Sequence, residues 1–355
     1  GTIKIWPGVA EEQIGTKAYY VRAGLCTDVG GNLLAHVDDS SATDWGHPDG
    51  YTGLVSVLYT FKGLSSHAAG GPWRGRSALD AVELMDIGWN FRREHFRLPS
   101  RSHYVIQIGG DQLNVVPQHA SVWYYFRELD YPNIRTMWAI GDSMATAAAM
   151  MSGTTLDNSR VLGSAWPPHF NKPMAEAMFA NIKTVGMPAW SEDDQRFAKA
   201  LQKELKQEEK GLSLKPDTVL QGPPTEFARN GGGSDDIGDV SWAVPTITLR
   251  YPSGIPSTPG HNWADAIAMA TPIAHKGATA GAKAQAMMML DLLLTPKLIT
   301  DAWDYFRNVQ TKDRKYEPLI RPGDQPAIEL NQGILERYRE QMRPLYYDPK
   351  KYKTY

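Results

Sequence analysis

Two adjacent glutamates, Glu11 and Glu12, follow a Pro-Gly break in the chain and stand at the start of a predicted helix. Neighbouring carboxylates repel one another unless a positive charge lies between them. A divalent metal is one such charge: one carboxylate would bind the metal, while the other would act as general base on a water molecule. A glutamate pair is also typical of a solvated helix N-terminus, where the helix dipole favours acids. The pair alone leaves both interpretations open.

Three histidines stand in loops or at a strand end, where an imidazole can be offered to a metal or a substrate. His36 ends an apolar stretch, and strand ends in α/β sheets commonly present ligands. His67 lies in a Ser-Ser-His-Ala-Ala loop that could expose it to a substrate, and His261 lies in a loop that opens a helix. A lone histidine in such a position is also typical of a structural, hydrogen-bonded side chain.

Asn114 and Arg127 lie on either side of a predicted turn at Pro117. An arginine on a strand can bind a carboxylate through two parallel hydrogen bonds, and an amide can add a third. An ordinary surface arginine is the alternative interpretation. Asp236 belongs to an acidic loop, residues 233–242. A calcium loop would need a glutamate at its twelfth position, which is absent here, so the calcium interpretation is excluded.

The elements that must position these residues follow from hydrophobic periodicity and from Gly and Pro breaks. Between residues 53 and 165 the pattern is strand, helix, strand, strand, helix, strand, which is the split-βαβ order of ferredoxin-like domains. The predicted strands are 55–62, 102–108, 120–127 and 156–162, and the predicted helices are 75–95 and 133–151.

The regions on either side alternate helices with short apolar strands, which predicts the α/β class. Changes in pattern divide the chain into residues 1–52, 53–165, 166–300 and 301–355. The N-terminal region predicts a strand over 2–6, a helix over 11–23 and a strand over 32–37. Beyond residue 168 the predicted elements are helices over 174–185, 193–209 and 273–294 and a strand over 244–251.

The composition is that of an ordinary globular protein, with 355 residues of which 42% are hydrophobic and 21% charged. The net charge of -2 supplies no general attraction to nucleic acid or to an anionic membrane. The single cysteine, Cys26, excludes a disulfide within the chain. No apolar run approaches the roughly 18 residues of a transmembrane helix. We therefore expect a soluble protein with neither nucleic acid nor membrane as partner, located in the cytoplasm, with export left open.

The order of these motifs resembles the aminoacylase and carboxypeptidase G family of di-metal amidohydrolases, metallopeptidase family 20. The resemblance covers residues 1–300, and its most specific phrases lie at 75–97 and 236–245; residues 301–355 carry no motif and resemble C-terminal extensions. The motifs in chain order are Ala10-Glu11-Glu12, His36, the 61–69 loop with His67, Gly-Arg-Ser-Ala-Leu-Asp-Ala at 75–81, Asn-Val-Val-Pro at 114–117, Arg127, Gly-Asp-Val-Ser-Trp at 238–242 and Gly260-His261.

The resemblance implies a fold in which an α/β metal-binding domain is interrupted by a ferredoxin-like lid domain. The catalytic parts would be residues 1–52 and 166–300, and the lid would be 53–165, through which two copies of the chain form a homodimer. The implied reaction is hydrolysis of the amide bond of an N-acyl or N-aroyl amino acid, such as an aroyl-glutamate, by a metal-activated water.

Family motif positions assign metal chemistry to four residues. Glu11 would be the general base, Glu12 and His36 would be metal ligands, and His261 would bind the second metal. Two divalent ions are implied, and because histidine and carboxylate ligands suit both metals, zinc and manganese stay open.

The same positions assign substrate contacts to residues of the lid. His67 would reach into the partner subunit's site and polarise the scissile carbonyl, while Asn114 and Arg127 would bind the substrate's carboxylate. Asp236 would support the metal ligands from behind.

The chain departs from the family pattern upstream of the glutamate pair. The family takes its remaining metal ligands from a segment before that pair, where this sequence has only residues 1–10. Zinc sites normally use three protein ligands or more. We therefore expect the remaining ligands on a segment outside this sequence or on a separate chain. The alternative is a non-catalytic, dimeric binding or assembly protein with an incomplete metal site.

Overall fold

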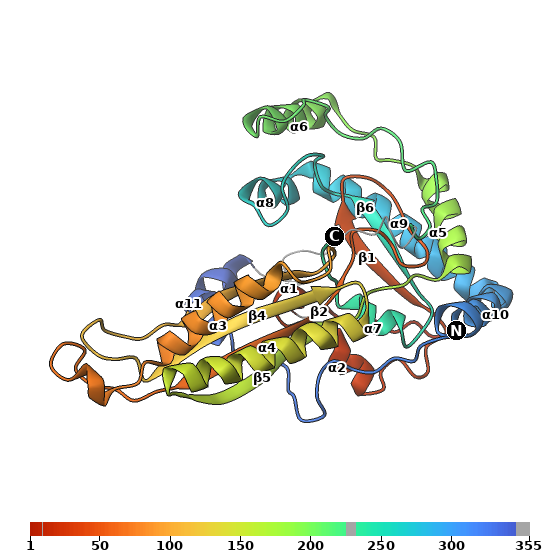
Figure 1. Cartoon of the computed structure of the whole chain (residues 1–355). Helices are drawn as coiled ribbons and strands as arrows, with labels where there is room; N and C mark the ends of the chain where they lie inside the picture. The colour runs from red at the N-terminus through yellow and green to blue at the C-terminus, as the bar shows by residue number, and fades with distance from the viewer. Residues whose placement is uncertain (9, 225–231, 346–355) are drawn as a thin grey trace.

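The computed structural model describes residues 1–8, 10–224 and 232–345, which form an α/β structure with two separate sheets (Figure 1). One sheet has four antiparallel strands and the other has two parallel strands. The α/β class predicted from the sequence is confirmed. Among the described residues, no helix combines the length and hydropathy that a membrane crossing requires.

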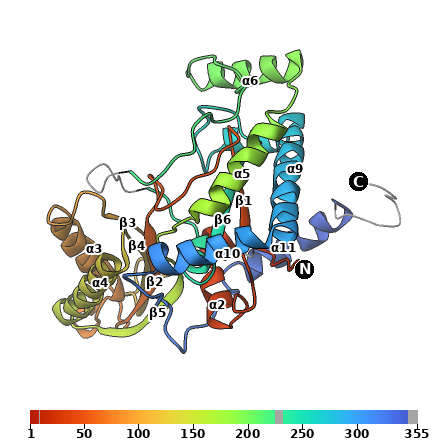
Figure 2. The same cartoon turned by 90° about the vertical axis from the view of Figure 1, so that its right-hand side faces the viewer.

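The four-stranded sheet has the strand order β3-β4-β2-β5, and helices α3 and α4 cover one of its faces (Figures 1 and 2). Along the chain the elements run β2, α3, β3, β4, α4, β5, which matches the predicted order and the ferredoxin-like sheet. The action of this unit as a lid or dimerisation module stays a prediction. The bounds are β2 Gly53–Lys62, α3 Ala78–Arg93, β3 Arg101–Ile108, β4 His119–Glu128, α4 Tyr131–Ser152 and β5 Thr155–Ala165.

Alternation along β2 explains why this sheet packs against its helices. Val55, Val57, Tyr59 and Phe61 are fully buried on one face and belong to the same core as Trp89 of α3. Each such side chain contributes about 1.5–3 kcal/mol when it leaves water. Because successive side chains of a strand point to opposite faces, the intervening residues point away from this core.

The two-stranded sheet pairs β1 with β6 in parallel, with His36 in register with Arg250. Helices α5 and α9 pack on it and share a core that includes Met178, Ile247 and Met288. Because the strands are parallel, their carboxyl ends meet at one edge of the sheet. The bounds are β1 Asn32–Asp38, β6 Thr246–Pro252, α5 Lys172–Val185, α9 Pro272–Leu294 and α10 Pro296–Tyr305.

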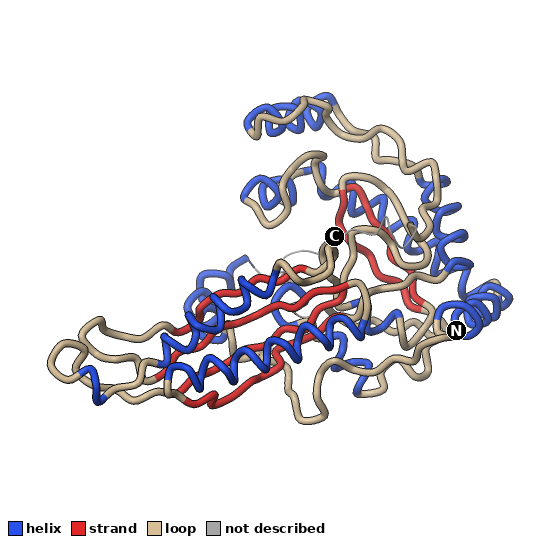
Figure 3. The backbone as a smooth tube through the Cα atoms, in the orientation of Figure 1, coloured by secondary structure: helices blue, strands red, loops and turns tan. Residues whose placement is uncertain are grey.

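Two loops, residues 39–52 and 166–171, connect these two units (Figure 3). The remaining elements are α1 Glu11–Ile14, α2 Lys17–Arg22, η1 Pro72–Arg74, α6 Glu192–Glu204, α7 Ile237–Ser241, α8 Trp263–Met269, η3 Phe306–Gln310, α11 Gln332–Met342 and η4 Arg343–Leu345. Of the predicted C-terminal extension, residues 346–355 lie outside the described residues.

The strand predicted over residues 2–6 is wrong in this structure. These residues form no strand, and Ile3 and Ile5 are 54% and 86% exposed. Alternation of Ile with polar residues favours a strand only if a neighbouring strand supplies hydrogen bonds. Among the described residues, β1 pairs with β6 and no strand pairs with residues 2–6.

The helix predicted over 11–23 is interrupted, and the helix predicted over 193–209 ends early. Gly15 adopts a φ of 47° and ends α1, so that α2 starts afresh at Lys17. A Cβ at Gly15 would lie 2.9 Å from the Ser164 carbonyl oxygen, so the close approach to β5 also requires glycine. The second helix ends at Glu204, after which Lys206 turns the chain with a φ of 56°.

Candidate active site

A cavity of about 970 Å³ opens at the carboxyl ends of β1 and β6. This is the edge at which parallel sheets bind ligands. Four of the predicted site residues line it: Glu11, Glu12, His36 and His261. Residues that the sequence interpretation had not selected also line it, among them Asp38, Tyr51, Asp235 and Arg250.

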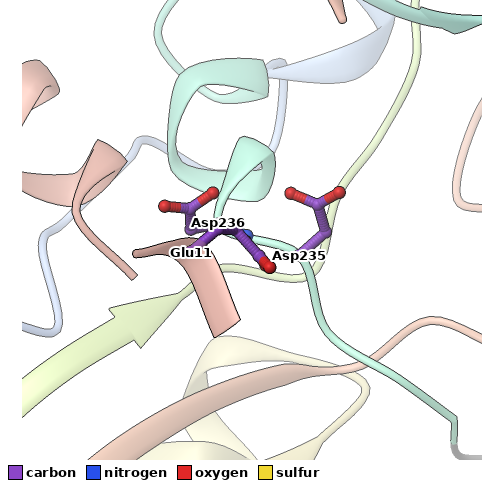
Figure 4. A group of neighbouring side chains, drawn as sticks. All are labelled: Glu11, Asp235 and Asp236. Carbon is purple, nitrogen blue, oxygen red and sulfur yellow. The ribbon is translucent and has the colours of Figure 1, made fainter. Parts of the chain in front are cut away.

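Three carboxylates form the most acidic part of the site. Glu11 from α1 and Asp235 and Asp236 from the loop before α7 each place one oxygen within 4.8 Å of the others (Figure 4). Burial, together with the negative charges of Asp235 and Asp236, raises the pKa of Glu11 to about 7. Of the three carboxylates, Asp236 is ion-paired with Lys17, which leaves Glu11 and Asp235 as the acids that a divalent cation could neutralise.

Glu12 and His261 meet across the cavity, with Oε2 and Nε2 3.6 Å apart. Both side chains are largely exposed. His261 has a φ of 54°, the left-handed region that few residues other than glycine adopt. Strained backbone of this kind persists where the surrounding structure requires it and is common at functional sites.

His36 reaches the same cavity with one ring nitrogen already engaged. Its Nδ1 lies 2.7 Å from the Val37 carbonyl oxygen, an atom that can only accept a hydrogen bond. Nδ1 therefore carries the proton, and Nε2 of a neutral imidazole keeps its lone pair. That tautomer is the one in which histidine binds metals through Nε2.

Arg127 on β4 lies beside the glutamate pair but in a second, smaller cavity of about 40 Å³ that Glu11, Glu12 and Ser164 also line. Its Nη1 donates to Ser234 Oγ at 3.0 Å. Its Nε is buried and has no hydrogen-bond partner among the described residues. A buried, unpartnered guanidinium N–H beside a space of this size suits a carboxylate oxygen.

His67 and Asn114 lie together, but they line neither of these cavities. The loops that carry them follow β2 and β3, and Ala68 N donates to Asn114 O at 2.9 Å. The backbone N–H groups of Ala69 and Gly70 donate to His67 Nδ1 at 3.1 and 3.0 Å. Nδ1 is thus an acceptor, so the proton of a neutral His67 lies on Nε2, which makes Nε2 a hydrogen-bond donor.

Asp236 is 1% exposed and does not face the large cavity. Lys17 holds both of its carboxylate oxygens: Nζ forms an ion pair with Oδ1, and the backbone N donates to Oδ2 at 3.0 Å. The Asp236 backbone N–H in turn lies 3.4 Å from Glu11 Oε1. Lys17 carried no signal in the sequence, where it resembles any helix-surface lysine.

Arg250 and Asp235 also line the large cavity, although neither was selected from the sequence. Arg250 forms an ion pair with Asp44 at 2.8 Å, approaches Asp38 at 3.6 Å and lies 3.4 Å from the Tyr51 hydroxyl. Only the position of Asp235, next to Asp236 in an acidic loop, could have indicated its place in the site.

The donor set around the cavity is made of carboxylate oxygens and imidazole nitrogens. Such ligands suit zinc and manganese alike. The neighbouring carboxylates of Glu11 and Asp235 and the Nε2 lone pair of His36 both fit a divalent cation. The structure is thus consistent with metal binding at this edge of the sheet.

Comparison with known proteins identifies relatives that are named as a hydrolase subunit and a dipeptidase. No family model matches the chain. One of the subunits of the p-aminobenzoyl-glutamate hydrolase of Escherichia coli (strain K12) is 30% identical over 350 residues, which cover 90% of this chain and 70% of that protein. The Xaa-Arg dipeptidase of Mus musculus is 28% identical over 290 residues, covering 82% of this chain and 59% of the dipeptidase.

Among solved structures, an aminobenzoyl-glutamate utilization protein from Klebsiella pneumoniae superposes with a TM-score of 0.47 at 16% identity, over 65% of this chain and 52% of that one. The chain thus spans between about half and 70% of the length of these relatives. On the identity and coverage of the Escherichia coli relative, the chain belongs to the aminoacylase and carboxypeptidase G-like amidohydrolases, metallopeptidase family 20.

Proposed function

We propose that this chain hydrolyses the amide bond of an N-acyl or N-aroyl amino acid, with a metal-activated water as nucleophile and Glu11 as general base. The observation that carries the proposal is the convergence of Glu11 and Glu12 with His36 and His261 on one cavity at the carboxyl edge of a parallel sheet. The names of two relatives, part of an aminobenzoyl-glutamate hydrolase and a dipeptidase, support an amide as substrate.

Glu12, His36 and His261 would hold divalent metal, and Asp235 is a further carboxylate that lines the same cavity. A divalent metal supplies Lewis acidity, which lowers the pKa of a water molecule from 15.7 toward about 7. Asp236 is not assigned as a ligand, because both of its carboxylate oxygens are engaged by Lys17.

Glu11 would take a proton from the attacking water and later give it to the leaving amine. Its carboxylate lines both cavities, so it lies between the proposed metal ligands and Arg127. A base in this place can reach a water on one side and the leaving nitrogen of a bound substrate on the other. General acid–base catalysis of this kind contributes about 10²–10⁴-fold to a rate.

Arg127 would orient the substrate through its carboxylate. The unpartnered Nε, buried beside the glutamate pair, can donate one charge-assisted hydrogen bond to a carboxylate oxygen. The substrate class that we propose, an aroyl-glutamate, comes from the name of the relative. The free carboxylates of such a substrate need a cation such as the Arg127 guanidinium.

His67 would stabilise the oxyanion from a second copy of the chain. The fixed tautomer presents Nε2–H as a donor, which is the form that an oxyanion requires. Because His67 and Asn114 line neither cavity of their own chain, they would act on the site of the other protomer in a homodimer.

A separate polypeptide is a further proposed partner. The Escherichia coli relative is named as one subunit of a hydrolase, and that protein is longer than the part this chain matches. Such a partner would contribute metal ligands beyond those on this chain.

The test is hydrolysis of p-aminobenzoyl-glutamate and a panel of N-acyl amino acids, combined with metal analysis and intact mass of the purified protein. We expect metal-dependent turnover with about two metals per site. Finding neither metal nor turnover, with no co-purifying chain, would favour the non-catalytic binding or assembly protein instead.

A further inference from the structure

Lys17 is a partly buried cation next to the proposed general base Glu11, and the mechanism above gives it no role. It is the first residue of α2, and its side chain is only 13% exposed. Its partner Asp236, at the start of α7, is 1% exposed. The pair joins two helices that are far apart in the sequence and lies directly behind Glu11.

Lys17 contacts Asp236 with two different groups. The Nζ ammonium forms an ion pair with Oδ1, and the backbone N–H donates to Oδ2 at 3.0 Å. The backbone contact depends on the start of α2, where N–H groups lack helical partners and can donate to a carboxylate. Together the two contacts leave the Asp236 carboxylate a single orientation.

Asp236 in turn contacts Glu11 through its own backbone N–H group. The Asp236 backbone N–H lies 3.4 Å from Glu11 Oε1, a long hydrogen bond to the oxygen nearer the loop. The adjacent Asp235 carboxylate repels the same glutamate. The position of the Glu11 carboxylate therefore depends on where Asp236 holds its backbone.

Stability alone is a weak reason for such a pair. Removing two ions from water costs about as much as their attraction returns, and apolar replacements are often equally stable. Elsewhere in the chain a comparable pair, Lys276 with Asp194, lines neither cavity and caps helix α6. Lys17 with Asp236 differs because its hydrogen bonds lead to the general base.

We propose that Lys17 is a positioning residue. By binding the Asp236 carboxylate it fixes the position of the Asp236 backbone N–H, and this N–H orients the Glu11 carboxylate. This inference rests on the proposed function, in which Glu11 is the base. It predicts that loss of Lys17 lowers the rate of the chemical step more than substrate binding, because Arg127 donates its hydrogen bond to Ser234 and not to Lys17's partner Asp236.

The experiment compares kcat and KM for p-aminobenzoyl-glutamate in the wild type, K17M, K17R, D236N and the double variant K17M/D236N, with K276M as matched control. For K17M we expect kcat to fall by about 10–100-fold, the usual effect of residues behind a metal site, with little change in KM. K17R should recover part of the rate because it restores the charge. K276M should keep the wild-type kcat.

The double variant tests whether Lys17 acts through Asp236. If it does, K17M/D236N should match D236N within about twofold, since two residues on one route are not additive. Multiplying effects, or a K17M rate equal to the wild type, would overturn the proposal. Should K17M fail to fold, D236N, which leaves Lys17 in place, must itself lower kcat; a wild-type rate for D236N overturns the proposal equally.

Failure of the proposed function gives a different result. A wild type that holds metal but shows no turnover, or an E11Q variant that keeps turnover, refutes Glu11 as base and with it the role of Lys17. Turnover that E11Q abolishes and K17M leaves intact refutes Lys17 alone.

Discussion

Glu12 Oε2 and His261 Nε2 lie 3.6 Å apart, although the two residues are far apart in the sequence. Both side chains are mostly exposed, so solvent screens their attraction and an exposed pair contributes little stability. Their proximity results from the backbone: α1 and the loop after β6 converge on the same edge of the two-stranded sheet. A divalent cation bound between them would add the electrostatic attraction that the solvent-exposed pair lacks.

Replacing Glu11 by Gln should abolish hydrolysis while leaving metal bound. The amide keeps the size of the side chain but cannot take a proton, so kcat should fall by about 10²–10⁴-fold. Turnover and metal content are measured on the same preparation. Full activity in E11Q would show that Glu11 is not the base.

Removing divalent metal with a chelator should eliminate turnover and lower the melting temperature. A ligand present at 100 times its Kd stabilises a fold by about 2.7 kcal/mol, and that stabilisation is lost with the metal. Adding back zinc or manganese should restore both, less so in H261A. Identical melting curves with and without chelator would contradict a metal at this site.

Mixing H67A with E11Q should regenerate activity that neither variant has alone. If His67 serves the partner's site, the mixed dimer contains one site with both Glu11 and His67 intact. H67A alone should lose about 10²–10³-fold in kcat, the usual value of one oxyanion donor, with its dimer content unchanged. No recovery on mixing, despite verified heterodimers, would place His67 outside the partner's site.

Replacing Arg127 by Met should weaken the binding of substrates with a free carboxylate. Losing one partner of a buried charge pair costs about 2–5 kcal/mol, or roughly 30-fold or more in kcat/KM. A substrate whose carboxylate is amidated should be hydrolysed equally by R127M and the wild type. Arg160 lies on β5 of the same sheet and pairs with Glu329; it supplies the control R160M, for which no change is expected.

Replacing Asp239 by Asn should change how stability depends on pH. Asp239 is fully buried, accepts hydrogen bonds from the Tyr316 hydroxyl and the Trp166 backbone, and burial raises its pKa from 3.8 to about 7. Between these values the folded state keeps a proton that the unfolded state has lost. Stability should therefore fall as pH rises through this window, by up to about 1.4 kcal/mol per pH unit.

The same substitution removes that titration, so the difference in unfolding free energy between wild type and D239N should shrink as pH rises toward 7 and stay flat above it. Urea unfolding at several pH values measures it. A difference independent of pH would show that Asp239 does not titrate in this range.

The sequence by itself determined the four-stranded unit. Its strands and helices are long and strongly periodic, and each helix packs on strands close to it in the chain, so local pattern and final structure agree. Four of the residues that line the large cavity, Glu11, Glu12, His36 and His261, were selected from the sequence through their motif positions, whereas Asp235 and Arg250 were not.

Tertiary structure alone decided how these residues combine. Residues 2–6 have a strand pattern, yet a strand exists only where another supplies its hydrogen bonds. Gly15 splits the first helix because its approach to Ser164 depends on packing against β5. Lys17 reaches Asp236 through contact between distant segments, and no periodicity encodes such a contact. Residue type and local spacing set which groups the site can use; long-range packing sets which of them face one another.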